Sequence, residues 1–289
     1  MVLLAAWPRE ALAAAALLFG LVIGSFLNVV IHRLPRGESL SHPGSHCPAC
    51  GAPVRWYDNV PVLSFLLLGA RCRGCRVRIS WRYPAVELAT GLLFASIVWR
   101  HGPDPMTPVW CAFAAALLAS AVIDFDHQII PDEISLGGLV LALLLVPLVR
   151  ALGGEPIGNA LGWSAGGALL GGGIFWLVGF VHARVSTVFG RRFEHWPGPG
   201  EVLPRPSSLD YWVWFPGVGF GDVKLLALIG AVLGPIGVLQ TILAASLAGL
   251  VLGGAFALSL RRLGAPFGFG PALAAGALLV LLAPDLLPR

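Results

Sequence analysis

Charged side chains are scarce in this chain, which excludes a soluble globular domain. Only 12% of the 289 residues are charged, 57% are hydrophobic and the mean hydropathy is +0.82. A soluble domain has roughly twice that charged fraction. The composition therefore predicts an all-α polytopic membrane protein, and its 37 glycines suit helices that pack closely in lipid.

Lysine is almost absent: 18 of the 19 cationic residues are arginine, and Lys224 is the exception. The sequence pI of about 9.0 could indicate a nucleic-acid partner. However, most of the arginines fall in a few loops between apolar runs, a distribution that membrane orientation explains better. We therefore expect no nucleic-acid partner.

The features of a cleavable signal peptide are also missing. Residues 11–31 are apolar, but no basic flank precedes them and no A-x-A-like site follows, so this run is expected to remain a membrane span. A span needs about 20 apolar residues, and we predict about eight spans in all. They are residues 10–31, 84–100, 107–123, 133–150, 157–181, 222–234, 236–260 and 271–287. The sixth is short and only Gly234-Pro235 separates it from the seventh, so it could be tilted or half-length.

With eight spans, the loops alternate sides, and fifteen of the nineteen cations fall on one side, which the positive-inside rule assigns to the cytoplasm. The loops 32–83 and 182–218 would then both be cytoplasmic. The second of these contains Trp196, Trp212 and Trp214, whose rings could lie at the headgroup level or form a lid over a site.

Four of the five cysteines form two C-x-x-C pairs separated by 21 residues. Gly51 and Gly74 lie close to the pairs, so each pair could bind a metal from one tight turn, as in four-thiolate zinc sites. Two disulfides are the alternative, which a cytoplasmic location disfavours. A closed four-thiolate site has no open position for chemistry, so zinc would stabilise a loop too short to build its own core. The predicted ligands are Cys47, Cys50, Cys72 and Cys75.

Two carboxylates stand at the ends of apolar runs, where an ionisable group is costly and marks a candidate functional site. Asp124 ends the run 109–123, and Asp222 follows Gly219-Phe220-Gly221 at the start of another. In the predicted topology both lie at the cytoplasmic face. Paired carboxylates can hydrolyse a peptide, because the ionised one activates water while the protonated one donates to the carbonyl oxygen. Neither a Ser–His nor an H-E-x-x-H pattern in any span competes with them.

Other interpretations of the acidic residues remain. Asp222 could cap the helix that follows it, and paired acids also serve proton-coupled transporters, although those have acids near mid-membrane and inverted repeats. A structural membrane scaffold is a further alternative. For the neighbouring residues we expect Asp132 to cap the fourth span, whereas Lys224 could extend towards lipid phosphates. Asn28 is expected to bond helix to helix, and Glu87 to pair with a loop arginine or contact a cationic ligand.

Together these motifs resemble the bacterial type IV prepilin peptidases, in the order of that family and over nearly the whole chain. The resembling segments are residues 24–35, the two cysteine pairs, residues 82–91, residues 123–132 and residues 219–224. One departure is Ala70, at a position where the family commonly has glycine and in a region tied to methylation. The loop 182–218 is also longer than in most relatives.

The resemblance implies an inner-membrane aspartic endopeptidase whose substrates are type IV prepilins and type II secretion pseudopilins. It implies cleavage of the basic leader after a glycine, with Asp124 and Asp222 as the catalytic residues, and N-methylation of the new N-terminus with S-adenosylmethionine. The expected organisation is a first transmembrane helix in 1–31, a cytoplasmic zinc domain in 32–83 and a transmembrane protease core in 84–289.

Overall fold

The computed structural model describes residues 7–189, 205–213, 219–260 and 268–287. Helices dominate these residues, which form two isolated β-bridges but no sheet, so the predicted all-α fold is confirmed. The chain divides into two compact units, an N-terminal unit of residues 1–127 and a C-terminal unit of residues 128–289.

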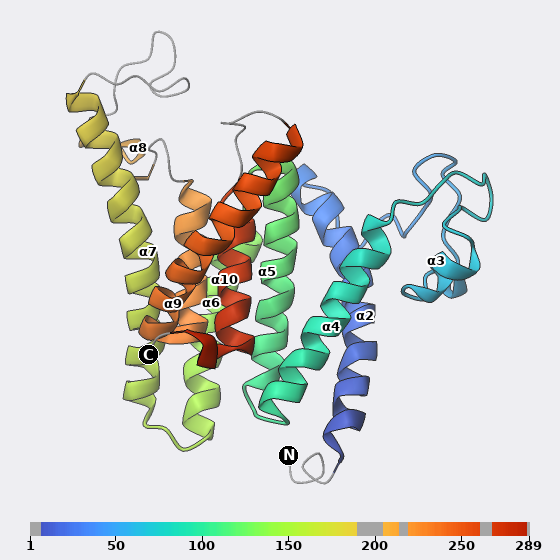
Figure 1. The fold of residues 1–289 in the computed structure, drawn as a ribbon, viewed down its shortest axis with the longest axis horizontal. Coiled ribbons are helices and arrows are strands. Elements are labelled where there is room, and N and C mark those ends of the chain that lie inside the picture. The colour runs from blue at the N-terminus through green and yellow to red at the C-terminus, as the bar shows by residue number, and fades with distance from the viewer. Residues whose placement is uncertain (1–6, 190–204, 214–218, 261–267, 288–289) are drawn as a thin grey trace. The chain divides into compact units, whose positions relative to one another are not determined.

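The N-terminal unit contains three long helices: α2 (Arg9–Arg33), α4 (Arg82–His101) and α5 (Thr107–His127). Between α2 and α4 lies a mostly irregular segment with the 3₁₀ turn η2 (Trp56–Asp58) and the short helix α3 (Leu63–Leu67) (Figure 1). Helices α2 and α4 touch through glycine, since a Cβ added to Gly24 would lie 2.6 Å from the Cα of Glu87. Small residues at such crossings let membrane helices pack closely.

The C-terminal unit contains α6 (Asp132–Leu152), α7 (Ile157–Val188), the short α8 (Asp210–Val213), α9 (Phe220–Leu260) and α10 (Gly270–Leu282). Helices α7 and α9 meet backbone to backbone. A Cβ on Gly167 would lie 2.1 Å from the carbonyl oxygen of Gly230, and one on Gly171 would lie 2.3 Å from that of Leu226. This crossing therefore has no space for any side chain at Gly167 or Gly171.

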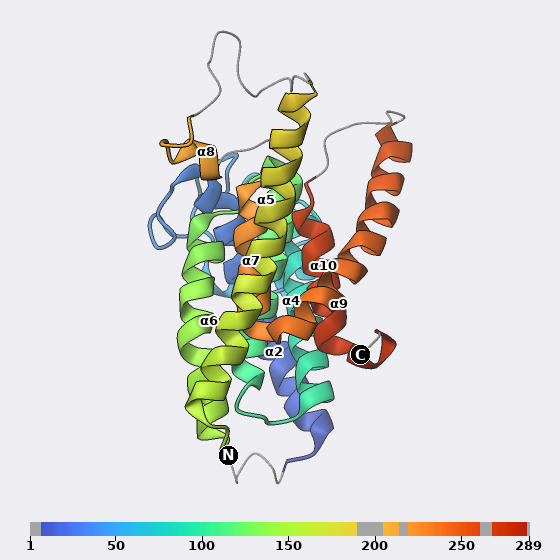
Figure 2. The same ribbon diagram turned by 90° about the vertical axis from the view of Figure 1, so that its left-hand side faces the viewer.

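Helix α9 bends sharply at Gly234, whose φ of 73° and ψ of −179° are not helical. Pro235 follows and cannot donate a helical hydrogen bond. The two arms of α9 run in roughly opposite directions on either side of the bend (Figures 1 and 2). The arms correspond to the predicted sixth and seventh spans, so the break expected at Gly234-Pro235 is confirmed.

Five of the described helices are long and apolar enough to cross a membrane: α2 with its continuation to Arg36, α5, α6, α7 and α9. Helix α10 is shorter, and α4 is not among the five. The predicted count of eight spans therefore stays a prediction. Helix α7 continues to Val188, seven residues beyond 181, so the predicted loop 182–218 begins as helix.

Candidate functional site

The two cysteine pairs come together in the N-terminal unit. The four sulfur atoms of Cys47, Cys50, Cys72 and Cys75 all lie within 4.8 Å of one another, and none of these cysteines forms a disulfide. The Sγ atoms of Cys47 and Cys75 are 3.8 Å apart. Zinc–sulfur bonds of about 2.3 Å in a tetrahedron place the sulfur atoms about 3.8 Å apart. The cluster therefore fits a tetrahedral metal ion, and its all-thiolate ligand set suits a soft one.

Each cysteine pair sits in a tight hairpin that aims both sulfur atoms the same way. In the first, the Cys47 N–H donates to the Ala52 carbonyl at 2.9 Å and Gly51 turns the chain with a φ of 68°. In the second hairpin the residue with positive φ is Arg76 (φ 60°), not the glycine that the sequence offers nearby, Gly74. The Cα of Gly74 instead faces the cluster, since a Cβ there would lie 3.9 Å from Cys50 Sγ.

The hairpin backbone also prepares a thiolate. The N–H groups of Cys50 and Ala49 lower the pKa of the Cys47 thiol from 9.0 to about 6. A deprotonated thiol is the form that binds a metal. Outside the cluster, Arg73 donates to both carboxylate oxygens of Asp58, at 2.7 and 2.8 Å, and so joins the second hairpin to the turn η2.

Asp124 lies in the last turn of α5, in the N-terminal unit, and is buried. Two residues further along, Asp126 forms an ion pair with Arg82 in the first turn of α4. This pair ties the end of α5 to the beginning of α4. Sequence reasoning did not predict it, although both residues lie in motifs that carried the family resemblance.

Asp222 lies in the first turn of α9, in the C-terminal unit, and both glycines before it have a structural reason. A Cβ on Gly219 would stand 3.3 Å from Oδ2 of Asp222, so the carboxylate folds back over this residue. A Cβ on Gly221 would stand 3.2 Å from Cβ of Ile130, so glycine lets the start of α9 approach a neighbouring segment. Gly221 therefore allows a close approach to Ile130, whereas Gly219 meets only the side chain of Asp222.

Lys224 forms an ion pair with Asp132, the first residue of α6. The predicted cap at Asp132 was wrong, and Lys224 has a protein partner. Lys224 does not extend towards lipid phosphates, because its ammonium group has a carboxylate partner 92 residues away in the sequence. Asp132 does not cap α6, because Pro131 occupies the N-cap position and the helix has no side-chain cap. The start of α9 is therefore attached to the start of α6.

Two polar residues connect α4 to the rest of the N-terminal unit. The side-chain amide of Asn28 donates to the Tyr83 carbonyl at 3.1 Å, which confirms a hydrogen bond between helices α2 and α4. Glu87 accepts the backbone N–H of Val62 at 2.7 Å, so its partner from the loop is the backbone and not an arginine. Val62 has a φ of 62°, which turns its N–H towards α4.

The described part of the predicted loop 182–218 packs against α7. Trp212 in α8 stacks on Phe180, with ring centroids 5.3 Å apart, and its carbonyl accepts the indole N–H of Trp176 at 2.8 Å. Trp196 and Trp214 lie outside the described residues. Trp212 therefore attaches α8 to α7 within its own unit.

The helical apolar fold and the cysteine cluster define a multi-pass membrane protein with a segment whose four cysteines could hold a metal ion. Two family models match the chain: the bacterial peptidase A24 N-terminal domain over residues 18–101 and the type IV leader peptidase family over residues 111–254. Asp124 and Asp222 both fall within the second match.

Curated relatives match over most of the chain. A prepilin leader peptidase/N-methyltransferase of Pseudomonas aeruginosa is 34% identical in an alignment of 304 positions, gaps included. The alignment covers 94% of this chain and 91% of the relative. One of Neisseria gonorrhoeae is 32% identical, covering 93% and 90%, and one of Myxococcus xanthus is 37% identical, covering 85% and 63%. The chain therefore belongs to the type IV leader peptidase family, as its motifs predicted. No solved structure matches it.

Proposed function

We propose that this protein is a membrane aspartic endopeptidase that cuts the basic leader from type IV prepilins and pseudopilins after a glycine, with Asp124 and Asp222 as the catalytic pair. The observation that carries the proposal is that two aspartates inside the leader-peptidase match occupy helix ends, one of them buried. The names of the relatives support the substrate class.

The proposed hydrolysis needs no metal at the aspartates. The ionised carboxylate takes a proton from water, whose oxygen forms a bond to the scissile carbonyl carbon, and the protonated carboxyl group donates its proton to the carbonyl oxygen. When the tetrahedral intermediate collapses, the C–N bond breaks, the leaving amine takes a proton from the first carboxyl group, and the second recovers its own. A leader that ends in glycine supports this reaction, since glycine lets the chain unwind and expose the peptide bond.

The two helix ends favour different roles. The N-terminal end of a helix stabilises a negative charge, whereas the C-terminal end does not. Asp222 lies at the beginning of α9, and Asp124 lies buried near the end of α5. We therefore assign Asp222 as the ionised group that activates water and Asp124 as the group that donates a proton.

The cysteine cluster is proposed to hold structural zinc. Four thiolates close the coordination sphere, so the ion would stabilise the segment 32–83 and take no part in hydrolysis. We further propose an inner-membrane location with this segment and both aspartates at the cytoplasmic face, supported by the asymmetric distribution of arginines. The domains would be 1–31, 32–83 and 84–289, as expected from the sequence.

Cleavage is tested with purified Asp124→Asn and Asp222→Asn proteins and a prepilin in detergent. Both should lose leader removal, because a single carboxylic group cannot act as both acid and base. Glu133→Gln is the matched control, since Glu133 is an exposed acid in the first turn of α6. Full cleavage by either aspartate variant would refute the catalytic pair.

The second proposed activity is methylation of the new N-terminal amine, supported by the N-methyltransferase part of the relatives' names. S-adenosylmethionine would supply the methyl group from its sulfonium, leaving S-adenosylhomocysteine and a proton. Mass spectrometry of the cleaved pilin with and without S-adenosylmethionine should show an added methyl group in the first sample alone. Its absence would remove this activity and leave the peptidase proposal intact.

A further inference from the structure

Helix α3 in the zinc-binding segment exposes a face made only of leucine. Leu63, Leu66 and Leu67 have the i, i+3, i+4 spacing that puts side chains on one side of a helix, and they are 52%, 61% and 77% exposed. Ser64 and Phe65 lie buried on its other side. We call these three residues the leucine face. A helix in a water-exposed loop ordinarily has the opposite polarity.

Two exposed tryptophans border α3 on the side of Ser64 and Phe65, opposite the leucine face. Trp81 packs edge to face on Phe65 of α3, with ring centroids 4.7 Å apart. Trp56 lies in the turn η2, which the hydroxyl of Ser64 joins to α3 by donating to the Tyr57 carbonyl at 2.9 Å. Both indoles are exposed. Tryptophan is enriched at the level of lipid headgroups, because one end of its ring is apolar and the other donates a hydrogen bond.

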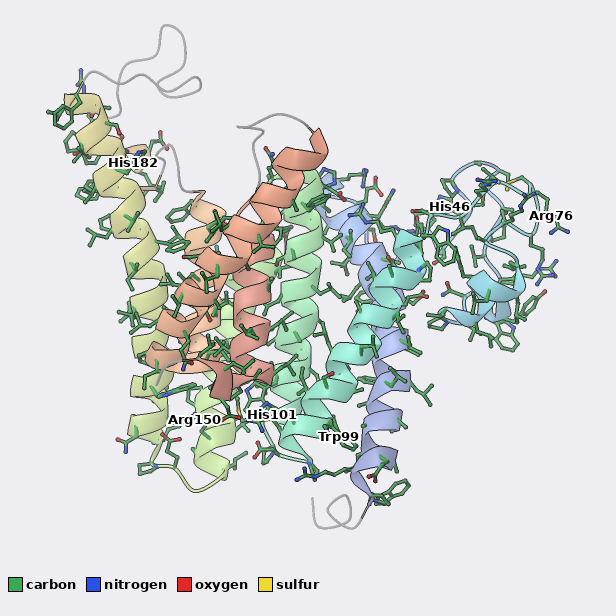
Figure 3. All side chains as sticks on the ribbon, viewed as in Figure 1. His46, Arg76, Trp99, His101, Arg150 and His182 are labelled. Carbon is green, nitrogen blue, oxygen red and sulfur yellow. The ribbon has the colours of Figure 1, made fainter. Side chains whose placement is uncertain are left out.

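The charge of the segment fits an anionic surface. Residues 32–83 contain eight arginines and two acidic residues, so the balance stays positive even with the −2 charge of a zinc tetrathiolate. Arg71 and Arg78 face each other across the second cysteine hairpin and are exposed. Arg76, in the same hairpin, points away from the rest of the unit (Figure 3). Arginines near an anionic leaflet strengthen attachment to it.

The leucine face is also held at the level where a neighbouring helix starts. Val62, directly before α3, donates to Glu87 in the second turn of α4, and Trp81 is the N-cap of that helix. In Figure 1, α3 accordingly lies level with the first turns of α4. The segment is further connected at its other end to α2, one of the helices long enough to span a membrane. Anchoring at both ends limits how far α3 can move from the bilayer surface.

We propose that the leucine face inserts into the headgroup region of the membrane while the arginines of the second hairpin bind anionic lipid. The segment is then an in-plane membrane anchor of the kind that combines apolar side chains with basic ones. The proposal does not depend on the catalytic assignments. It also gives the metal cluster a purpose, since the hairpins it closes carry the lipid-binding arginines.

The test uses the full-length protein in nanodiscs, with photoreactive p-benzoylphenylalanine in place of Leu67 or, as the control, in place of exposed Ser41. In phosphatidylglycerol nanodiscs, ultraviolet light should give lipid adducts at position 67 and none at position 41. Retained metal would show that each labelled protein is folded. No lipid adduct at position 67, equal adducts at both positions, or an adduct there only to protein would each overturn the proposal.

The charge dependence is tested in the same assay. Phosphatidylcholine nanodiscs should give clearly fewer adducts at position 67 than phosphatidylglycerol nanodiscs, and the double variant Arg76→Glu/Arg78→Glu should reduce the phosphatidylglycerol adducts to the phosphatidylcholine level. Equal adducts in both lipids would contradict the binding of anionic headgroups. Hydrogen exchange gives an independent readout, because the α3 amides should be better protected in phosphatidylglycerol nanodiscs than in detergent.

Discussion

The two units hold their candidate aspartates by related means. In the N-terminal unit, Asp124 is followed two residues later by Asp126, which pairs with Arg82 at the beginning of α4. In the C-terminal unit, Asp222 is followed two residues later by Lys224, which pairs with Asp132 at the beginning of α6. Each ion pair connects the helix end that carries an aspartate to the first turn of another helix.

The two units differ in how far the helix end that carries the aspartate can move. In the C-terminal pair the lysine is the more buried partner (Lys224 15% exposed, Asp132 61%), and in the N-terminal pair it is the carboxylate (Asp126 25%, Arg82 43%). Helix α9 also touches the backbone of α7 at Gly167, so α9 cannot move closer to α7 at this crossing. We infer that the C-terminal unit positions its aspartate rigidly, while the N-terminal unit can adjust.

The largest expected effect concerns the glycine crossing of the C-terminal unit. Gly167→Leu inserts a side chain where even a Cβ would lie 2.1 Å from a carbonyl oxygen, so α7 and α9 must separate. We expect little folded protein by size-exclusion chromatography in detergent. Gly173→Leu is the matched control, because nothing lies within 4 Å of its added Cβ on the same helix. Equal yields of the two variants would show that α9 can move away from α7 without loss of the fold, which would contradict the proposed rigidity.

The second-largest expected effect is that of metal removal, which should change hydrogen exchange in the N-terminal unit and leave it unchanged in the C-terminal unit. A strong chelator should increase hydrogen exchange of the amides at Cys47, Gly51, Cys72 and Arg76, whose hydrogen bonds form the two hairpins. The amides of α7 and α9 should keep their protection, since the cysteine cluster belongs to the N-terminal unit alone. If exchange rose equally in both units, they would be energetically coupled and our comparison would fail.

The ion pairs should differ in their effect on cleavage. Asp132→Asn leaves the mostly buried Lys224 without its partner, and we expect kcat to fall about tenfold, which corresponds to about 1.4 kcal/mol. Asp126→Asn leaves an arginine that water can solvate, and the expected loss is about twofold. Exchanging the charges in the double variant Lys224→Asp/Asp132→Lys should recover part of the lost rate. The reverse ranking of the two single variants would contradict the proposed difference in rigidity.

Local patterns in the sequence predicted much of this architecture. The helical segments, the break at Gly234 and the cysteine cluster all follow from apolar runs, from a Gly-Pro pair and from C-x-x-C spacing. The partner of Lys224 does not, because Asp132 lies 92 residues away and an aspartate at a helix start ordinarily suggests a cap. The length of α7 was missed because His182 and Arg184 interrupt its apolar run without interrupting the helix.

Backbone conformation in the segment that carries the cysteine cluster was equally hard to predict, and it leads to the smallest expected effect. Gly69 and Ala70 both have positive φ, 61° and 58°. Alanine is strained in this left-handed region whereas glycine is not. Ala70→Gly should therefore stabilise the segment by about 1 kcal/mol, and Gly69→Ala should destabilise it by a similar amount, since nothing lies within 4 Å of the added Cβ.

Chelator competition measures both variants, since 1 kcal/mol corresponds to about a fivefold change in apparent metal affinity when metal binding is coupled to folding. Affinity should rise for Ala70→Gly and fall for Gly69→Ala, because the Ala70 carbonyl accepts the Ile79 N–H at 2.8 Å and so closes the hairpin that carries Cys72 and Cys75. Both variants lie in the N-terminal unit, so neither should alter hydrogen exchange in α9. If metal affinity changed in the same direction in both variants, the left-handed backbone at Gly69 and Ala70 would not be the cause of the change.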